Sequence, residues 1–405
     1  MIVLRFAVAL AYLRLLTMKI QRIEPVPLTA PFTFQGLPAS HPYNGVRNCV
    51  WLRIDTDEGI TGWGEVYLGC YATEVAIASL KRFCHGLTGK DPMDPVSLME
   101  EARYDNRYWA MRGIGAQSSS AVEGALWDIV GKAKQQPVWK LLGDGRPRPI
   151  LPYASAGIGE LSPREIHDEV KRFTARGYRA YKMSCGGFPV TQDGEMKRDI
   201  ERVAAAREAL GPERLLFVDV FVPQRRRTWK QSQAEAYMRA LHPYHVGFME
   251  EPAMTYDVRG YRELQALKLI PTAGGESFSC PEEFEPFFEA GALGVAQPDA
   301  AVVGGPASSA AVCRRAHALG VPVCPHAYSA GVGLAQNLHA AWSTEGVLAV
   351  EFPQEIHPLA KEPLKEIWNF KDGHVAPPDR PGLGVVITEE FLIKYAYQPN
   401  PVRNY

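Results

Sequence analysis

The chain has 405 residues, of which 46% are hydrophobic and 22% are charged, and its formal net charge is −1. This length allows two or three domains, and the hydrophobic fraction suits a large buried core. A nearly neutral chain gives no sign of a basic face, so we expect no nucleic-acid partner. The seven cysteines have no paired spacing, which favours reduced thiols in a cytoplasmic protein over a disulfide framework.

Residues 1–17 are apolar enough to suggest a signal peptide, but Arg5 and Arg14 interrupt the run. The run is also too short to span a membrane, and it lacks a clean cleavage site of small residues. We therefore predict an extension ahead of a start at Met18, with a signal peptide as the alternative. No membrane partner is expected.

Residues 18–148 are predicted to form a separate α+β domain. Alternating segments that begin at Met18 and Cys49, followed by a turn over 57–59 and a further segment from Ile60, predict an antiparallel meander. Three helices are predicted after it, over about 72–87, 94–110 and 117–142. The segment 31–48, with His41 and Tyr43 near its tip, has the length of a lid or a disordered loop.

Residues 149–360 contain short apolar runs that each end in a polar residue. The polar, helical-looking segments between them are typical of buried parallel strands joined by crossover helices. After a first run over 150–155, the runs end at Lys182, Asp219, Glu250 or Glu251, Glu276, Asp299, His326 and Glu351. Successive ends are 37, 31, 26, 23, 27 and 25 residues apart. Eight such units close into a barrel with its catalytic groups at the carboxyl ends of the strands.

The predicted fold is therefore α/β. It combines an N-terminal α+β domain over 18–148 with a barrel of the modified (β/α)7β type over 149–360. Residues 361–405 are expected to return and pack on the N-terminal domain.

Three consecutive strands of this barrel end in Asp219, Glu250 and Glu276. Carboxylates this close repel one another, and a bound cation is the usual way to relieve that repulsion. A set of oxygen ligands without His or Cys suits Mg²⁺ better than zinc. The alternative is that one or more of them pairs with Lys or Arg. Glu251 and Glu250 are expected to point to opposite faces, so only one of the two should face the cation.

Asp299 and His326 end adjacent strands across the mouth of the barrel from Lys182. A carboxylate beside an imidazole orients its tautomer and raises its basicity, which makes a general base or acid near neutral pH. A lone histidine in a barrel would more often be structural, but the pairing with Asp299 favours a catalytic role.

Six motifs together resemble those of the enolase superfamily, specifically its mandelate racemase branch. They are VDVF, MEEP, GGES, QPDAAVVGG, PHAYSAGVG and LAVEFP, which carry Asp219, Glu250, Glu276, Asp299, His326 and Glu351. The stretches GWGE over 62–65 and ALWDIVGKAKQQPVWKLLG are similar to the capping domain of that family. The resemblance covers nearly everything from Met18 onward.

The resemblance implies an acid substrate whose carboxylate binds Mg²⁺, a base that removes the α-proton, and an enediolate that the metal stabilises. It assigns the three carboxylates to the metal and Asp299 with His326 to the acid–base dyad. Lys182 and Glu351 are then expected at the substrate carboxylate.

The sequence departs from the family pattern at two places. The family's second strand usually carries two lysines with one residue between them, whereas this chain has Lys182 and then Ser184, which is expected to contact substrate but not to act as a base. Lys182 could replace the missing base if its pKa fell. Arg225–Arg227 follow a strand end, and we expect Arg225 either to bind a polyhydroxy or polyanionic acid or to belong to a solvated charge run.

With one competent dyad, the predicted function is a Mg²⁺-dependent lyase that dehydrates a sugar acid to a 2-keto-3-deoxy acid. Racemisation is disfavoured because it needs a base on each face of the substrate. The alternatives are an isomerase, either an epimerase or a cycloisomerase acting on a carboxylic acid, and a non-catalytic metal-binding relative. We also expect the protein to form a homo-oligomer.

Overall fold

The computed structural model describes residues 17–34, 44–185, 192–221 and 229–399. The predictions for residues 1–16, for His41 and Tyr43, and for Arg225–Arg227 lie outside the described residues. Within the described ranges, none of the helices is both long and apolar enough to cross a membrane.

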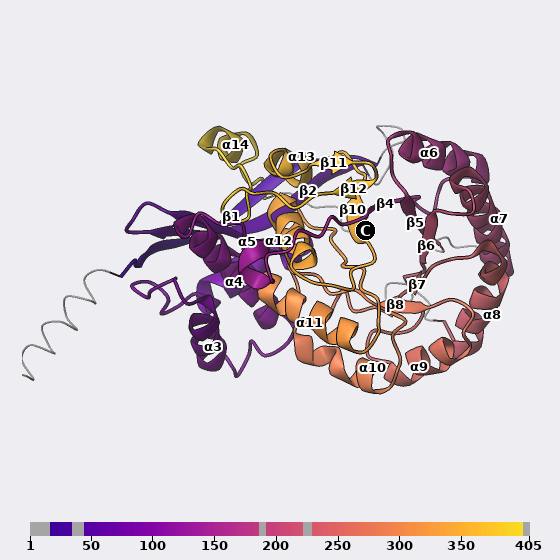
Figure 1. The fold of residues 1–405 in the computed structure, drawn as a ribbon, viewed down its shortest axis with the longest axis horizontal. Coiled ribbons are helices and arrows are strands. Elements are labelled where there is room, and N and C mark those ends of the chain that lie inside the picture. Colours follow the sequence, from indigo (N-terminus) through magenta and orange to yellow (C-terminus); the bar gives the residue numbers. More distant parts are fainter. Residues whose placement is uncertain (1–16, 35–43, 186–191, 222–228, 400–405) are drawn as a thin grey trace, which may run out of the picture.

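The N-terminal region contains the predicted antiparallel meander, in the strand order β1-β2-β3. β1 pairs with β2 along most of its length, with one register shift between Ile20 and Arg22, and β2 pairs with β3. The strands are β1 (Ile20–Phe32), β2 (Gly45–Thr56) and β3 (Thr61–Val66), followed by a short 3-10 helix over Tyr67–Cys70 and the helices α2 (Thr73–Phe83), α3 (Pro95–Asp105), α4 (Gly113–Ala133) and α5 (Val138–Leu142). Figure 1 shows this region beside the barrel, where β3 contacts α12 (Gly331–Trp342) and α4 contacts α11 (Pro306–Ala318).

The prediction of one helix over 117–142 is wrong, because α4 ends at Ala133 and α5 starts at Val138. Gln135 adopts a left-handed backbone conformation with φ of 51°, and Pro137 has no N–H to continue the helical hydrogen bonds. The earlier part of α4 lies flat on β3. A Cβ at Gly64 would come within 1.8 Å of the Ala121 carbonyl oxygen, so this close approach requires glycine.

The barrel contains seven parallel strands in the order β10-β4-β5-β6-β7-β8-β9. They are β4 (Pro152–Ala156), β5 (Ala180–Ser184), β6 (Leu215–Asp219), β7 (Met249–Glu250), β8 (Thr272–Gly274), β9 (Val295–Ala296) and β10 (Val350–Pro353). Figure 1 shows the crossover helices as an outer ring around these strands. The helices are α6 (Pro163–Ala175), α7 (Gln192–Leu210), α8 (Gln231–Leu241), α9 (Val258–Ala266), α10 (Glu285–Glu289), α11 (Pro306–Ala318) and α12 (Gly331–Trp342), with 3-10 turns at His242–Tyr244 and Pro281–Glu283.

The seventh predicted strand, over 321–326, is reduced to single bridges at Val323. Val323 pairs in parallel with Ala296 on one side and with Val347 on the other, so the ring still closes. Pro322 and Pro325 remove two N–H donors from this segment, which prevents a continuous ladder of hydrogen bonds. The (β/α)7β-type barrel is thus confirmed, with one strand position held by a single residue.

Inside the barrel, an apolar layer lies beneath a polar one. The apolar layer contains Tyr153, Ala180, Phe217, Phe248, Ala273, Val295, Cys324 and Ala349, one from each strand position. Side chains two residues apart on a strand point to the same face. The residues two positions further on are therefore also directed inward, and they include Ser155, Lys182, Asp219, Glu250, Gln297, His326 and Glu351. The alternation of the strands is what places the polar residues together at one end.

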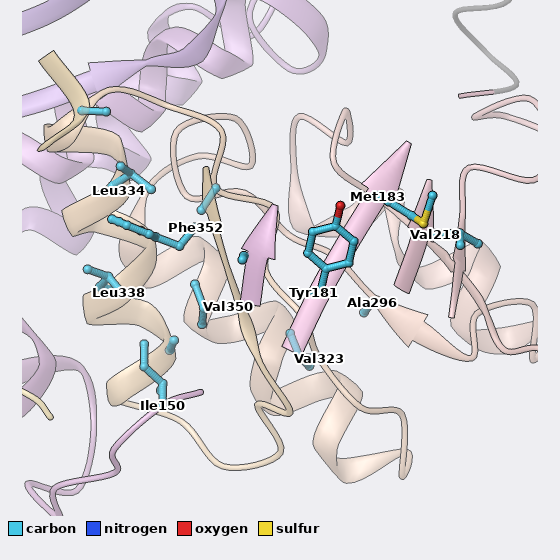
Figure 2. Packing of buried hydrophobic residues seen from close by; sticks show 14 of the residues in the cluster. Ile150, Tyr181, Met183, Val218, Ala296, Val323, Leu334, Leu338, Val350 and Phe352 are labelled. Atoms are coloured by element: carbon cyan, nitrogen blue, oxygen red, sulfur yellow. The ribbon is translucent and has the colours of Figure 1, made fainter. Parts of the chain in front are cut away.

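The outer faces of the strands pack against the surrounding helices. In Figure 2, Leu334 and Leu338 of α12 project toward the strand that carries Val350 and Phe352. Beyond β10 the chain forms α13 (Pro358–Lys361), a 3-10 turn at Glu362–Leu364, the hairpin β11 (Phe370–Lys371) and β12 (His374–Val375), and α14 (Glu389–Lys394).

The C-terminal segment contacts the N-terminal sheet. The ring of Phe391 stacks on that of Trp51, with centroids 5.7 Å apart, and the Thr29 N–H donates to the Tyr395 carbonyl oxygen at 2.9 Å. The predicted boundaries at 148 and 360 stay predictions.

Candidate active site

Three carboxylates meet at the carboxyl ends of β6, β7 and β8. One oxygen each from Asp219, Glu250 and Glu276 can be chosen so that all three lie within 4.8 Å of one another. Asp219 and Glu250 are the last residues of their strands, and Glu276 follows β8 by two residues. Asp219 and Glu250 are buried, whereas the side chain of Glu276 stays 15% exposed.

The electrostatics of this cluster fit a divalent cation bound through oxygen. Burial, followed by the charge of Glu250, raises the pKa of Asp219 well above its usual range. The Glu250 Oε1 atom is buried and has no hydrogen-bond partner within the described part of the chain. A carboxylate oxygen left in this state is costly unless something positive meets it, and a small hard cation such as Mg²⁺ prefers such ligands.

Glu251 comes directly after the end of β7 and adopts a left-handed backbone conformation with φ of 48°. Its side chain is buried, and after burial its charge is the largest cause of the raised pKa of Glu276. Of the two neighbouring glutamates, only Glu250 offers an oxygen to the cluster with Asp219 and Glu276, and the prediction that the two point to opposite faces stays a prediction.

Lys182 of β5 lies between two groups of carboxylates. Its Nζ atom is 2.8 Å from Glu250 Oε2, 2.8 Å from Glu351 Oε1 and 3.6 Å from Asp219 Oδ2. Burial opposes the charge, but Glu250 and Glu351 raise the pKa of Lys182 well above its usual value. The surrounding carboxylates therefore favour the protonated, cationic form of Lys182.

His326 and Asp299 form a buried pair, with the His326 Nδ1 atom 2.7 Å from Asp299 Oδ2. The other oxygen of Asp299 accepts hydrogen bonds from the Ala301 N–H at 2.7 Å and from Asn337 Nδ2 at 2.8 Å. The tautomer that donates from Nδ1 to Asp299 leaves Nε2 directed into the site. Nε2 lies 3.8 Å from Glu276 Oε2 and 3.7 Å from Glu351 Oε2. Nε2 is therefore the atom available for proton transfer.

The carboxylates around His326 outweigh its burial. Burial alone lowers the pKa of the imidazole, but the charges of Glu276 and Glu351 and the hydrogen bond to Asp299 raise it to about 10. A cation held by Glu276 would reduce that carboxylate's effect and bring the pKa of His326 back toward neutrality.

Glu351 of β10 is held as an anion. It accepts hydrogen bonds from Ser155 Oγ at 2.7 Å and from the Ala327 N–H at 3.0 Å. Although burial opposes ionisation, Lys182 and His326 lower the pKa of Glu351 to about 2. Glu351 thus joins the lysine side of the site to the histidine side.

Ser184 lies two residues beyond Lys182 at the end of β5 and is partly exposed. Its main chain is tied down, since its N–H donates to the Gly157 carbonyl oxygen and its carbonyl oxygen accepts from the buried guanidinium of Arg202 at 2.9 Å. Arg225, the other residue expected to bind substrate, lies outside the described residues.

Three residues of the site were not singled out from the sequence. Ser155 occupies the inward position of β4 that matches Lys182 on β5, so the strand phase could have found it. Gln297 lies two residues before Asp299, is fully buried, and both polar atoms of its side chain lack a partner among the described residues. Tyr67 comes from the N-terminal region, and its ring meets that of His326 edge-on at 5.4 Å. No periodicity in the sequence could have revealed that contact.

Two family models match this chain. Residues 165–391 match the enolase C-terminal domain-like family, and residues 37–143 match the N-terminal domain of mandelate racemase and muconate lactonizing enzyme. The chain belongs to the enolase superfamily. The resemblance seen in the sequence motifs is confirmed, including its mandelate racemase-like branch.

Relatives from this superfamily resemble the chain over almost its whole length. A D-galactonate dehydratase from Variovorax paradoxus is 30% identical over 372 residues, which are 90% of this chain and 95% of the relative. The solved structure of the 3,6-anhydro-D-galactonate cycloisomerase from Zobellia galactanivorans matches with a TM-score of 0.81 and 26% identity, covering 94% of this chain and 100% of the other. An enolase superfamily member from a Polaromonas species has a TM-score of 0.79 at 28% identity, covering 95% and 99%.

Proposed function

We propose that this protein is a lyase that removes water from a sugar acid to give a 2-keto-3-deoxy acid, with Mg²⁺ as its cofactor. The observation that carries the proposal is the buried Asp299–His326 pair, whose free Nε2 lies 3.8 Å from the carboxylate of Glu276. This arrangement brings one acid–base group beside a candidate metal centre. The similarity to D-galactonate dehydratases supports a sugar acid as substrate.

Asp219, Glu250 and Glu276 are proposed to hold the metal. When bound, Mg²⁺ supplies positive charge next to the substrate carboxylate and so stabilises the negative charge that develops after the α-proton is lost. Lys182 would contact the same carboxylate from the other side, and Glu351 would do so in its protonated form, because two carboxylates without a proton between them repel. The Lys182 ammonium can donate to it, and the short contacts to Glu250 and Glu351 fix the ammonium in place.

His326 is proposed to take the α-proton on Nε2, while Asp299 holds the ring and balances the imidazolium charge. The carbon–hydrogen bond breaks, its electrons move into an enediolate, and the β-hydroxyl then leaves. The protonated His326 can return its proton to that departing hydroxyl, so that water is released, and the enol that remains tautomerises to the 2-keto-3-deoxy acid. One dyad is enough for this series of reaction steps. Ser184 stands in place of a second lysine, so the opposing base that racemisation needs is missing.

A cycloisomerase is the second candidate, because the Zobellia galactanivorans enzyme shares the fold at 26% identity. It would use the same proton abstraction but would release no water. The two functions therefore differ in the mass of the product.

A screen of sugar acids in the presence of Mg²⁺ tests the proposal, with D-galactonate as the first acid. Mass spectrometry and a carbonyl reagent would report the product. We expect one or more acids to lose the mass of one water and gain a 2-keto group, and we expect EDTA to stop the reaction. A product of unchanged mass would favour the isomerase. Turnover of no acid in the screen would contradict an enzymatic role in sugar-acid dehydration.

A further inference from the structure

The last strand of the N-terminal sheet, β3, reaches the two loops that carry the dyad. One loop runs from Asp299 to the start of α11, and the other runs from His326 to the start of α12. The N–H of Tyr67, directly after β3, donates to the Ala301 carbonyl oxygen in the first loop at 3.0 Å. The ring of Tyr67 lies against His326 in the second.

Glu65 of β3 caps the N-terminus of α12. The N-cap residue of this helix is Ala330, which has no side-chain acceptor for the unpaired N–H groups of the first turn. The carboxylate of Glu65, from another part of the chain, takes this place. Its Oε1 atom accepts from the Ala330 N–H at 2.8 Å, and its Oε2 atom accepts from the Gly333 N–H at 2.7 Å. Trp51 Nε1 also donates to Oε2 at 3.1 Å. A buried anion at this end of a helix also suits the helix dipole.

α12, the helix that Glu65 caps, also holds Asp299 in place. Asn337 on α12 donates to Asp299 Oδ1 and accepts from the Ala300 N–H at 2.7 Å. The neighbouring Gln336 accepts from the Glu65 N–H at 2.7 Å and donates to the Ala300 carbonyl oxygen at 3.0 Å. Glu65 therefore connects to both members of the dyad, to His326 through the start of α12 and to Asp299 through its second turn.

A second buried carboxylate, that of Glu123, caps the N-terminus of α11. The N-cap of this helix is Gly305, and Glu123 of α4 accepts from the Ala307 N–H at 2.7 Å and from Ser308 Oγ at 2.9 Å. Gly305 has φ of 114°, and a Cβ there would come within 2.5 Å of the Glu123 Cβ. Both loops of the dyad are thus anchored at their far ends by carboxylates of the N-terminal region.

We propose that Glu65 is a positioning residue for the Asp299–His326 dyad. Through its hydrogen bonds to the first turn of α12, it fixes where the imidazole stands relative to Asp299 and the substrate. This role rests on the proposed function insofar as it concerns turnover. The N-terminal region then takes part in proton transfer by holding the dyad in place, in addition to covering the barrel.

The test compares Glu65→Gln and Glu65→Asp with Asp128→Asn. Asp128 is a matched control because it is equally buried and also holds β3, by accepting from the Trp63 N–H at 2.9 Å. Its second oxygen accepts from the Leu383 N–H in the C-terminal segment and contacts neither loop of the dyad. Measurements belong at about pH 8, because burial raises the pKa of Glu65 to about 7 and the carboxylate must be ionised.

Two measurements are needed. The first is kcat and KM on the best sugar acid, and the second is the ¹H–¹³C NMR cross-peak of the His326 ring in Mg²⁺-loaded protein. We expect Glu65→Gln to lower kcat roughly 10-fold to 100-fold with little change in KM, since a small misplacement of a catalytic group has effects of this size. The His326 cross-peak should shift or broaden. Glu65→Asp should retain more kcat than Glu65→Gln, and Asp128→Asn should leave both readouts near those of the unmodified protein.

The outcomes separate the two proposals. If the unmodified protein turns over no sugar acid, the proposed function falls, while the cross-peak still tests positioning. If turnover is found but Glu65→Gln matches Asp128→Asn in kcat and in the cross-peak, the positioning role is overturned. If Glu65→Gln does not fold, the same comparison is made with Glu65→Asp, for which an unchanged cross-peak and kcat would overturn the role.

Discussion

His339 allows a prediction whose size follows from the structure. It lies fully buried on α12, where Nδ1 accepts from the Trp139 N–H of α5 at 3.0 Å and Nε2 faces the Leu383 carbonyl oxygen at 3.1 Å. Both contacts fit a neutral ring protonated on Nε2. Burial lowers the pKa of His339 from 6.5 to about 4, although the contact with Leu383 acts in the opposite direction.

The lowered pKa makes stability depend on pH in a defined window. Below about pH 6.5 the unfolded chain takes up a proton at this residue, whereas the folded protein does so only near pH 4. The contribution of the neutral ring is therefore complete above pH 6.5 and is lost as the pH falls toward 4. The two pKa values differ by about 2.5, which corresponds to about 3 to 4 kcal/mol, since a pKa difference of 1 is worth about 1.4 kcal/mol.

Urea unfolding followed by tryptophan fluorescence at several pH values would measure this loss. His339→Gln should be less stable than the unmodified protein at neutral pH, because the Trp139 N–H loses its acceptor, but its stability should fall by about 3 kcal/mol less between pH 6.5 and 4. His85→Gln is the matched control, since His85 is exposed and should leave the pH dependence unchanged. Parallel curves for His339→Gln and the unmodified protein would show that protonation of His339 does not cause the loss of stability.

Three further predictions concern the site. Removal of the metal should abolish turnover, and added Mg²⁺ should restore it; undiminished turnover without metal would contradict the magnesium centre. Glu276→Gln should weaken Mg²⁺ binding measured by calorimetry, because one of three anionic ligands is lost. Lys182→Met should mainly raise KM if Lys182 only binds the substrate carboxylate, so a collapse of kcat at saturating substrate would assign it a part in proton transfer. Because Ser184 stands where a second lysine would act as a base, α-proton exchange in D₂O should be confined to substrates or analogues that present the proton toward His326. Exchange on both faces would favour an epimerase.

The arrangement of the barrel could be predicted because the same phase repeats on every strand. Lys182, Asp219, Glu250 and Glu351 each follow an inward apolar residue by two positions, and the pleat of a strand carries that regularity directly into space. Placement at the carboxyl ends of parallel strands then brings them together whatever the details of packing.

What could not be predicted lies where the regular pattern stops. Glu251 follows the last residue of β7 and adopts a left-handed backbone conformation, which the alternation of a strand does not describe. Contacts between distant parts of the chain, such as Glu65 on the first turn of α12 or Tyr67 on His326, depend on how the domains dock. Such contacts leave no periodic signal in the sequence.

The most direct test of the account is the turnover of His326→Asn on a sugar acid that the unmodified protein dehydrates. The asparagine keeps a polar side chain of similar shape but removes the group proposed to take the α-proton. We expect kcat to fall by roughly 10²-fold to 10⁴-fold, the usual contribution of a general base, with Mg²⁺ affinity and folding retained. Asp299→Asn should cost less, because it disturbs the ring without removing it. A near-normal kcat in His326→Asn would show that His326 is not the base and would direct the search for the base to Lys182.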